Sequence, residues 1–510
     1  MLFKSTPIVA AAALALALAG CSGSPSGGPQ QASKNLTLGN VSTPTTFDAS
    51  NTRWANDSIY LQAVYDTLVK IAPNGTDVQP SLATKWSYNA DETVLTMTLR
   101  SDVKFTDGTP FTADVAAQNL LRYKQGTGSL AVLLTDVTDA KATDATTLVI
   151  TLKQADPALL VVLGQAPGLE ESPKAFGSAT AKTVPVGSGP YTLNSSQTVV
   201  GSSYVFDRNP NYWDSSSVHY DSITVKVYND PTSLLNALRG KQLDAAAVTD
   251  NTTIDQIKAA GYTVNSQELN FSGLMLLDRD GKLNPALANV KVRQAINYAI
   301  DANAMLKAVD KGYGTLTEQV FRPGSRGYDK SLDSTYNYDP SKARQLLAEA
   351  GYPNGFTLSL PTSSVISQSL WPLLQQQLQD VGIKVNLTDV GAAPNYISAL
   401  LGQKYPAAFF PLRRDPSDWL NIQNLISPSA VWNPMKHSDP KVNSLISTIQ
   451  TTTGDTQAAV LKQLNQYIVQ QAWFDVWYAP TLNYVTNSTT SATINNGNAY
   501  PYLWDIKPKA

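Results

Sequence analysis

Hydrophobic and polar residues alternate with two different periods along the chain, and the period changes repeatedly. Apolar residues at every second position predict strands at 35–41, 95–99 and 383–387, in which successive side chains face the core and the solvent. Apolar residues three and four positions apart predict helices at 54–69 and 292–300, each with one face packed into a core. Helices and strands therefore follow one another throughout, which is typical of an α/β or α+β fold.

Helix starts are marked by capping residues. Thr112 precedes an apolar-periodic segment, and Asp230 and Asp339 are each followed by proline, a pairing that places a capping carboxylate just before the first helical position. Gly351 is suited to end the helix that starts after Asp339. We expect helices to begin at these three positions.

The length of the chain indicates more than one lobe. A chain of 510 residues with 43% hydrophobic residues is too long for one ordinary domain and can build a large core. No short repeat period and no sustained apolar run follow residue 20, so a repeat array and a membrane span after that point are not expected.

The N-terminal residues have the pattern of an export signal. Lys4 precedes an apolar stretch at 7–19, which predicts a signal peptide over 1–20. Leu18-Ala19-Gly20-Cys21 resembles the lipobox of bacterial lipoproteins, in which the cysteine accepts a diacylglycerol, so we expect Cys21 to be lipidated; the alternative is an ordinary secretion signal with a chance cysteine. Residues 21–33 are rich in Ser, Gly and Pro and predict a flexible tether.

The composition offers little for catalysis or nucleic-acid binding. The 38 basic and 40 acidic residues nearly cancel, which gives no field to attract nucleic acid. The two histidines have no partner at metal-ligand spacing, and neither a phosphate-binding loop nor a Gly-x-Ser-x-Gly elbow occurs. We therefore expect no metal, no cofactor and no enzymatic activity; a surface hydrolase and an adhesion module are the rival classes.

Aromatic and charged residues gather between positions 405 and 432. This segment holds Tyr405, Phe409, Phe410, Trp419 and Trp432 together with Arg413, Arg414, Asp415 and Asp418. Apolar walls with a few convergent charges are what a small-molecule pocket needs, whereas a packed loop with solvated charges is the alternative.

Six segments, in order along the chain, resemble one protein family. They are Pro-Ser-Leu-Ala-Thr-Lys-Trp at 80–86, the segment 99–115, Gly187-Ser188-Gly189-Pro190-Tyr191, Asn209-Pro210-Asn211-Tyr212-Trp213, and the segments 292–301 and 338–347. The chain is similar over nearly its whole mature length to the family 5 extracellular solute-binding proteins, which include dipeptide-, oligopeptide- and nickel-binding components of ATP-driven (ABC) importers.

The resemblance implies an α/β (α+β), two-lobed periplasmic-binding-protein-like fold that closes by hinge motion around a solute. Lobe I would comprise 34–65, 184–270 and 479–510, with an inserted subdomain at 66–183, and lobe II would comprise 271–478. The hinge strands would lie near 268–271 and 477–480.

The resemblance also places the ligand site between the lobes. We expect ligand contacts from Thr46, Trp54, Asn270, Phe271, Phe409, Arg413, Asp415 and Trp432. Peptide binders of this family commonly have a Trp and, three residues later, an Asp that pairs with the peptide amino group, where this chain has Phe409 and Leu412. The adjacent Arg413 and Arg414 reverse the local charge, although Asp415 can compensate in part. We expect at least one of the two arginines to face the cleft.

These observations predict a monomeric, exported protein, anchored by lipid at the outer face of the cytoplasmic membrane. It would deliver an oligopeptide or peptide-like solute to a permease and ATPase complex. The alternative solute is an oligosaccharide or glycoside, because aromatic faces stack on sugar rings.

Overall fold

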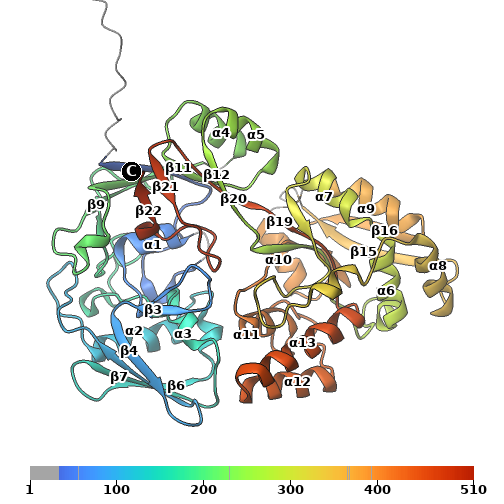
Figure 1. The fold of residues 1–510 in the computed structure, drawn as a ribbon, viewed down its shortest axis with the longest axis horizontal. Helices are drawn as coiled ribbons and strands as arrows, with labels where there is room; N and C mark the ends of the chain where they lie inside the picture. Colours follow the sequence, from blue (N-terminus) through green and yellow to red (C-terminus); the bar gives the residue numbers. More distant parts are fainter. Residues whose placement is uncertain are drawn as a thin grey trace, which may run out of the picture.

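The computed structural model describes residues 34–509 apart from 55, 56, 229, 364, 365, 367 and 392. Two lobes lie side by side, and the C-terminal segment returns to the first lobe (Figure 1). The predicted signal peptide, the tether and Cys21 lie outside the described residues. Within the described part, no helix is both long enough and apolar enough to cross a membrane.

The first lobe is built on a seven-stranded sheet. The central strand β1 (Asn35–Asn40) pairs in parallel with β10 (Ser222–Val227) and with β11 (Ala245–Val248). The remaining strands are antiparallel and complete the order β12-β20-β11-β1-β10-β9-β8; they are β12 (Thr263–Gln267), β20 (Leu482–Thr486), β9 (Ser203–Arg208) and β8 (Tyr191–Leu193). Helices α4 (Pro231–Arg239) and α5 (Ile254–Ala259) pack apolar side chains on one end of this sheet. A small pair formed by β21 (Thr490–Ala492) and β22 (Ile506–Pro508) closes the C-terminal segment.

A smaller sheet lies between α1 (Ser58–Val64) and β8 in the sequence. Its order is β4-β5-β7-β6, with β4 (Ala83–Tyr88), β5 (Val94–Leu99), β7 (Thr147–Leu152) and β6 (Val137–Ala142). Leu95, Met97 and Leu99 are buried, which confirms the alternating strand predicted at 95–99. Helix α2 (Ala113–Gln125), the short helix α3 (Leu159–Val162) and the hairpin of β2 (Val69–Ile71) with β3 (Val78–Pro80) pack beside it.

The second lobe has two sheets. The larger has the order β14-β19-β13-β17 with β18 also paired to β13; its strands are β14 (Gly314–Leu316), β19 (Phe474–Pro480), β13 (Asn270–Leu276), β17 (Ala407–Phe409) and β18 (Leu412–Arg413). The other is the parallel pair β15 (Phe356–Thr362) and β16 (Ile383–Asp389). The helices of the second lobe are α6 (Val290–Ala299), α7 (Ala302–Asp310), α8 (Pro340–Glu349), α9 (Leu370–Gln379), α10 (Ala393–Leu401), α11 (Asp418–Asn421), α12 (Pro440–Thr451) and α13 (Gly454–Gln470).

Two short segments join the large sheets of the two lobes. Glu268 and Leu269 connect β12 to β13, and Thr481 connects β19 to β20. Glu268 and Leu269 lie within the expected hinge range 268–271, and Thr481 directly follows the expected range 477–480. The residue boundaries of the lobes and of the inserted subdomain stay a prediction.

Local signals located most elements correctly. Thr112, Asp230 and Asp339 accept hydrogen bonds from the backbone N–H groups of Val115, Ser233 and Lys342, at 3.4, 2.8 and 2.9 Å, which confirms the predicted helix starts. The helix expected over 54–69 is shorter, however, because α1 ends at Val64 and β2 begins at Val69. Residues 57–69 are all buried, polar and apolar alike, so the spacing of apolar residues does not mark where the helix ends and the strand begins.

Two of the segments that carry the family resemblance, 187–191 and 209–213, pack around Asp66 in the first lobe. Asp66 is buried, and its carboxylate accepts hydrogen bonds from the Ser188 hydroxyl at 2.8 Å, the Tyr212 hydroxyl at 2.8 Å and the Trp213 indole at 3.0 Å. Gly189 lies against the end of α1, where an added Cβ would come within 2.4 Å of the Val64 carbonyl carbon. Burial raises the pKa of Asp66, and the three donors oppose this rise. These two motifs are therefore structural.

Candidate ligand-binding cleft

Three cavities lie along the boundary between the two lobes. The first, of about 330 Å³, is bounded by Asp77 and Pro157 of the first lobe and by Ser325 and Trp419 of the second. The second, of about 360 Å³, lies beside it between Lys153 and the segment around Asn424. The third, of about 330 Å³, adjoins the chain crossings and is lined by Ser266, Gln267, Glu268, Arg322, Pro323, Arg414 and Thr481. Each volume is in the range of small-molecule pockets.

The lobes touch each other directly around these cavities. Arg322 Nη1 donates a hydrogen bond to the Asn496 carbonyl at 2.7 Å, and the Arg413 guanidinium donates to the Gly497 carbonyl. On the far side, Gln450 Nε2 of α12 donates to the Ala155 carbonyl at 2.9 Å. Both ends of the cleft are thus bridged, as expected for a closed arrangement of a hinged pair of lobes.

Two of the predicted site residues, Arg413 and Asp415, meet at this boundary. Arg413 Nε lies 2.8 Å from Asp415 Oδ1, so the carboxylate offsets the charge of this arginine. The same guanidinium reaches Gly497 of the other lobe, so Arg413 lies at the boundary between the lobes; its contact with a solute stays a prediction. Asp415 also accepts from the Asn424 side chain at 3.2 Å.

Three of the predicted aromatic residues pack within the second lobe. Phe271 and Phe409 are buried in adjacent strands, and the Phe409 ring stacks on Trp477 with centroids 5.6 Å apart. The partly buried Trp432 stacks on Phe410 at 5.2 Å. Their direct contact with a solute stays a prediction, and the structure shows Phe271 and Phe409 as core residues of the second lobe.

The remaining predicted residues are spread over two regions. Thr46 and Trp54 belong to the first lobe: the Thr46 hydroxyl accepts from the Asp48 backbone N–H at 3.1 Å, and Trp54 lines a cavity of only about 10 Å³. Asn270 lies in β13 opposite Arg413 of β18, next to a crossing. The structure therefore brings Asn270, Arg413 and Asp415 together and leaves Thr46 and Trp54 in a separate part of the first lobe.

The lining of the cleft contains residues outside the eight expected ligand contacts. Arg322, Arg414 and Trp419 line cavities, and the loop 495–498 extends to the second lobe. Trp419 and Arg414 belong to the aromatic and charged segment at 405–432, so a signal existed for them. Arg322 and the loop have no local pattern that marks them.

Burial shifts the pKa of two acidic groups at the cleft. Burial raises the pKa of Asp156 to about 6, while the Ala158 backbone N–H opposes the rise and nearby Asp136 adds to it. Burial also raises the pKa of Asp418, whose Oδ2 accepts backbone N–H bonds from Arg326 at 2.9 Å and Gly327 at 3.2 Å. In the described part of the chain, no three His, Cys, Asp or Glu residues gather in a way that could hold a metal ion. The cleft is equipped to bind a polar solute by charge and hydrogen bonds.

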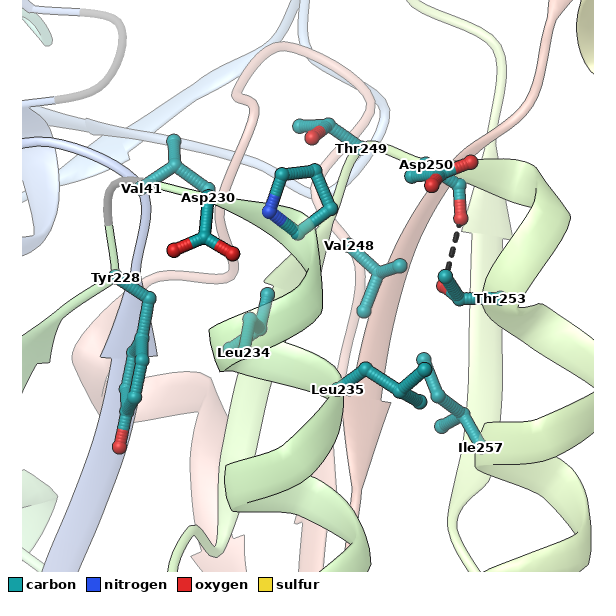
Figure 2. Close-up of a pocket in the computed structure, with 11 residues that line it drawn as sticks. Val41, Tyr228, Asp230, Leu234, Leu235, Val248, Thr249, Asp250, Thr253 and Ile257 are labelled. Atoms are coloured by element: carbon teal, nitrogen blue, oxygen red, sulfur yellow. Dashed lines mark hydrogen bonds between the residues drawn. The ribbon is translucent and has the colours of Figure 1, made fainter.

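A fourth cavity lies wholly within the first lobe (Figure 2). It measures about 80 Å³ and opens at the carboxyl ends of β1, β10 and β11, between Leu234 and Leu235 of α4 and Ile257 of α5. The Asp230 carboxylate at its edge caps α4, and the Thr253 hydroxyl donates to the Asp250 carbonyl at 2.7 Å. This space is too small for a peptide or a sugar, so the interlobe cavities are the candidate site.

Comparison with known proteins identifies the family. A model of the bacterial extracellular solute-binding proteins, family 5, matches residues 77–433. The glutathione-binding protein GsiB of Escherichia coli O157:H7 is 34% identical over 322 residues, which are 61% of this chain and 61% of that protein. GsiB of Salmonella typhi is 31% identical over 391 residues, 74% of this chain and 73% of that protein.

The fold agrees with this assignment. The periplasmic binding protein DppA of Helicobacter pylori, solved in complex with the peptide STSA, superposes with a TM-score of 0.79 at 20% identity and covers 93% of this chain and 98% of its own. The two-lobed α/β fold expected from the sequence is therefore confirmed. On the match over residues 77–433, the chain belongs to the bacterial extracellular solute-binding proteins, family 5.

Proposed function

We propose that the protein is the solute-capturing component of an ABC importer and that it holds an oligopeptide or peptide-like solute between its lobes. The observation that carries this proposal is the set of interlobe cavities, which have walls from both lobes and volumes of about 330–360 Å³. A solute that touches both lobes only when they are closed shifts the population toward the closed form, and that form is the one a permease can recognise. The permease and its ATPase are the partners.

The comparisons support a peptide-like solute. Relatives at 31–34% identity are named glutathione-binding proteins, and a protein of the same fold was solved with a bound peptide. A sugar is less favoured, because the Phe410 ring already stacks on both Tyr396 and Trp432, at 6.1 and 5.2 Å. Aromatic faces that cover one another are not free to stack on a sugar ring.

Thermal shift and small-angle scattering across panels of short peptides, glutathione and oligosaccharides test this proposal. A true solute stabilises the folded state by about 2.7 kcal/mol at a hundred times its Kd, and closure reduces the radius of gyration. A sugar that compacts the protein where no peptide does would establish the alternative solute. Stabilisation without compaction would contradict closure around the solute.

We also propose that Cys21 anchors the protein by lipid at the outer face of the cytoplasmic membrane. The support is the lipobox-like Leu18-Ala19-Gly20-Cys21, together with the tether at 21–33. Cys21→Ser should move the protein from the membrane fraction to the soluble fraction without changing its unfolding midpoint, because the anchor lies outside the folded lobes. Unchanged fractionation would contradict the anchor.

A further inference from the structure

The cavity at the chain crossings contains a buried arginine whose charge is only partly matched. Arg414 is 1% exposed and lines this cavity of about 330 Å³. Its Nε and Nη1 atoms have no hydrogen-bond partner among the described residues. The nearest ion-pair partner is Glu268, whose Oε2 lies 3.8 Å from Arg414 Nη2, beyond hydrogen-bond distance. Buried charges are normally paired and hydrogen-bonded, so this arrangement is incomplete without a further acceptor.

The surrounding charges favour an anion. Arg322, which is 9% exposed, lines the same cavity and uses one N–H to bind the Asn496 carbonyl. Glu268 is the one acidic residue in the lining, and its Oε1 accepts from the Thr315 hydroxyl at 2.6 Å. Two guanidinium groups against one carboxylate leave room for one negative charge.

The other acidic groups nearby are already engaged. Asp333 acts on Arg414 through space, but its carboxylate accepts hydrogen bonds from Thr317 at 2.7 Å and Tyr328 at 2.6 Å. Asp415 pairs with Arg413. Burial lowers the pKa of Arg414 to about 10, so the side chain remains a cation at neutral pH.

We propose that Arg414, with Arg322 beside it, is the subsite for a carboxylate of the solute, so that the protein selects acidic, peptide-like solutes. This inference rests on the proposed function, because it assigns one part of the same cleft. A carboxylate can accept two N–H bonds from one guanidinium, and such charge-assisted pairs are the strong ones. Glu268 and Thr481 belong to the two segments that connect the lobes, and both border the same cavity. A bound carboxylate would therefore lie next to these connections.

The test compares matched peptides that differ in one charge. Isothermal titration of the full chain uses the tripeptide Ala-Ala-Ala and its C-terminal amide. We expect the free acid to bind roughly 10- to 150-fold more tightly, the range for a hydrogen bond to a charged group. Arg414→Gln should bring the two affinities together. Glu268→Gln should increase the preference for the free acid over the amide, because it removes the competing carboxylate. Arg239→Gln, on the exposed end of α4, is the control for loss of a positive charge and should behave as wild type.

A second probe separates this inference from peptide binding. Thermal shift compares sodium acetate with sodium chloride at equal ionic strength. Acetate should raise the melting temperature of wild type and of Arg239→Gln, and it should raise that of Glu268→Gln further. It should leave the melting temperature of Arg414→Gln unchanged. If the peptides fail to bind but this acetate pattern is seen, the peptide proposal falls and the carboxylate subsite stands. If neither probe distinguishes Arg414→Gln from wild type, the subsite is refuted. Should Arg414→Gln not fold, an unchanged response of Glu268→Gln to both probes refutes it equally.

Discussion

Asp475 provides a test of how strand β19 tolerates a buried acid. It lies in β19, which leads into the crossing at Thr481, and its side chain is 2% exposed. Burial raises the pKa of Asp475 to about 8; the Trp477 side chain opposes this rise and Glu318 adds to it. In the unfolded chain the same carboxyl has a pKa of about 3.9.

The sign of the pH effect follows from these two values. Between pH 4 and pH 8 the native protein keeps a proton that the unfolded chain has released, so this group makes the free energy of unfolding fall as pH rises. The slope approaches about 1.4 kcal/mol per pH unit within that window, and it vanishes above pH 8. The loss across the window is therefore on the order of several kcal/mol, a large part of the stability of most domains.

Asp475→Asn removes the titration while keeping the shape of the protonated acid. We expect the variant to match wild type near pH 4 and to exceed it increasingly up to pH 8. Urea unfolding at pH 5, 6, 7 and 8, followed by both fluorescence and circular dichroism, gives the difference in midpoint at each pH. Asp91→Asn, at an exposed turn, is the control. A difference between variant and wild type that does not change with pH would refute the reasoning.

Three further substitutions test the division between fold and site. Asp66→Ala leaves the hydroxyls of Ser188 and Tyr212 and the Trp213 indole without their acceptor, so it should cost at least about 3 kcal/mol of unfolding free energy in urea titrations; a loss below 1 kcal/mol would contradict its central role. Phe409→Ala should lower the unfolding free energy by about 3–5 kcal/mol through the cavity left beside Trp477, and a fully stable variant with lost solute binding would instead make Phe409 a ligand contact. Arg413→Ala should weaken solute binding in calorimetry by about 1–2 kcal/mol with the fold retained, because the closed form loses the bond to Gly497; unaltered affinity would remove this residue from the site.

Local signals in the sequence were enough to establish the class of fold. The periodicity of strands such as β5, the capping of α4 by Asp230 and of α8 by Asp339, and the order of the six family-like segments each depend on residues close together in the chain. Such signals can be recognised without knowledge of the packing, since the two periods and the capping contacts are properties of single elements. They also indicated the segment around Arg413 as part of the site.

The contacts between residues far apart in the chain, in the core and in the candidate site, were decided by tertiary structure alone. Ser188 and Tyr212 meet Asp66 across more than a hundred residues, and no local pattern records that contact. Arg413 and Arg414 are neighbours of the same type in the sequence, yet the pairing of β18 with β13 sets Arg413 opposite Asn270. Side chains alternate between the two faces of an extended chain, so a shift of one residue would exchange the partly buried Arg413 and the buried Arg414. Register, which only the assembled sheet determines, made Arg414 the buried charge beside Glu268.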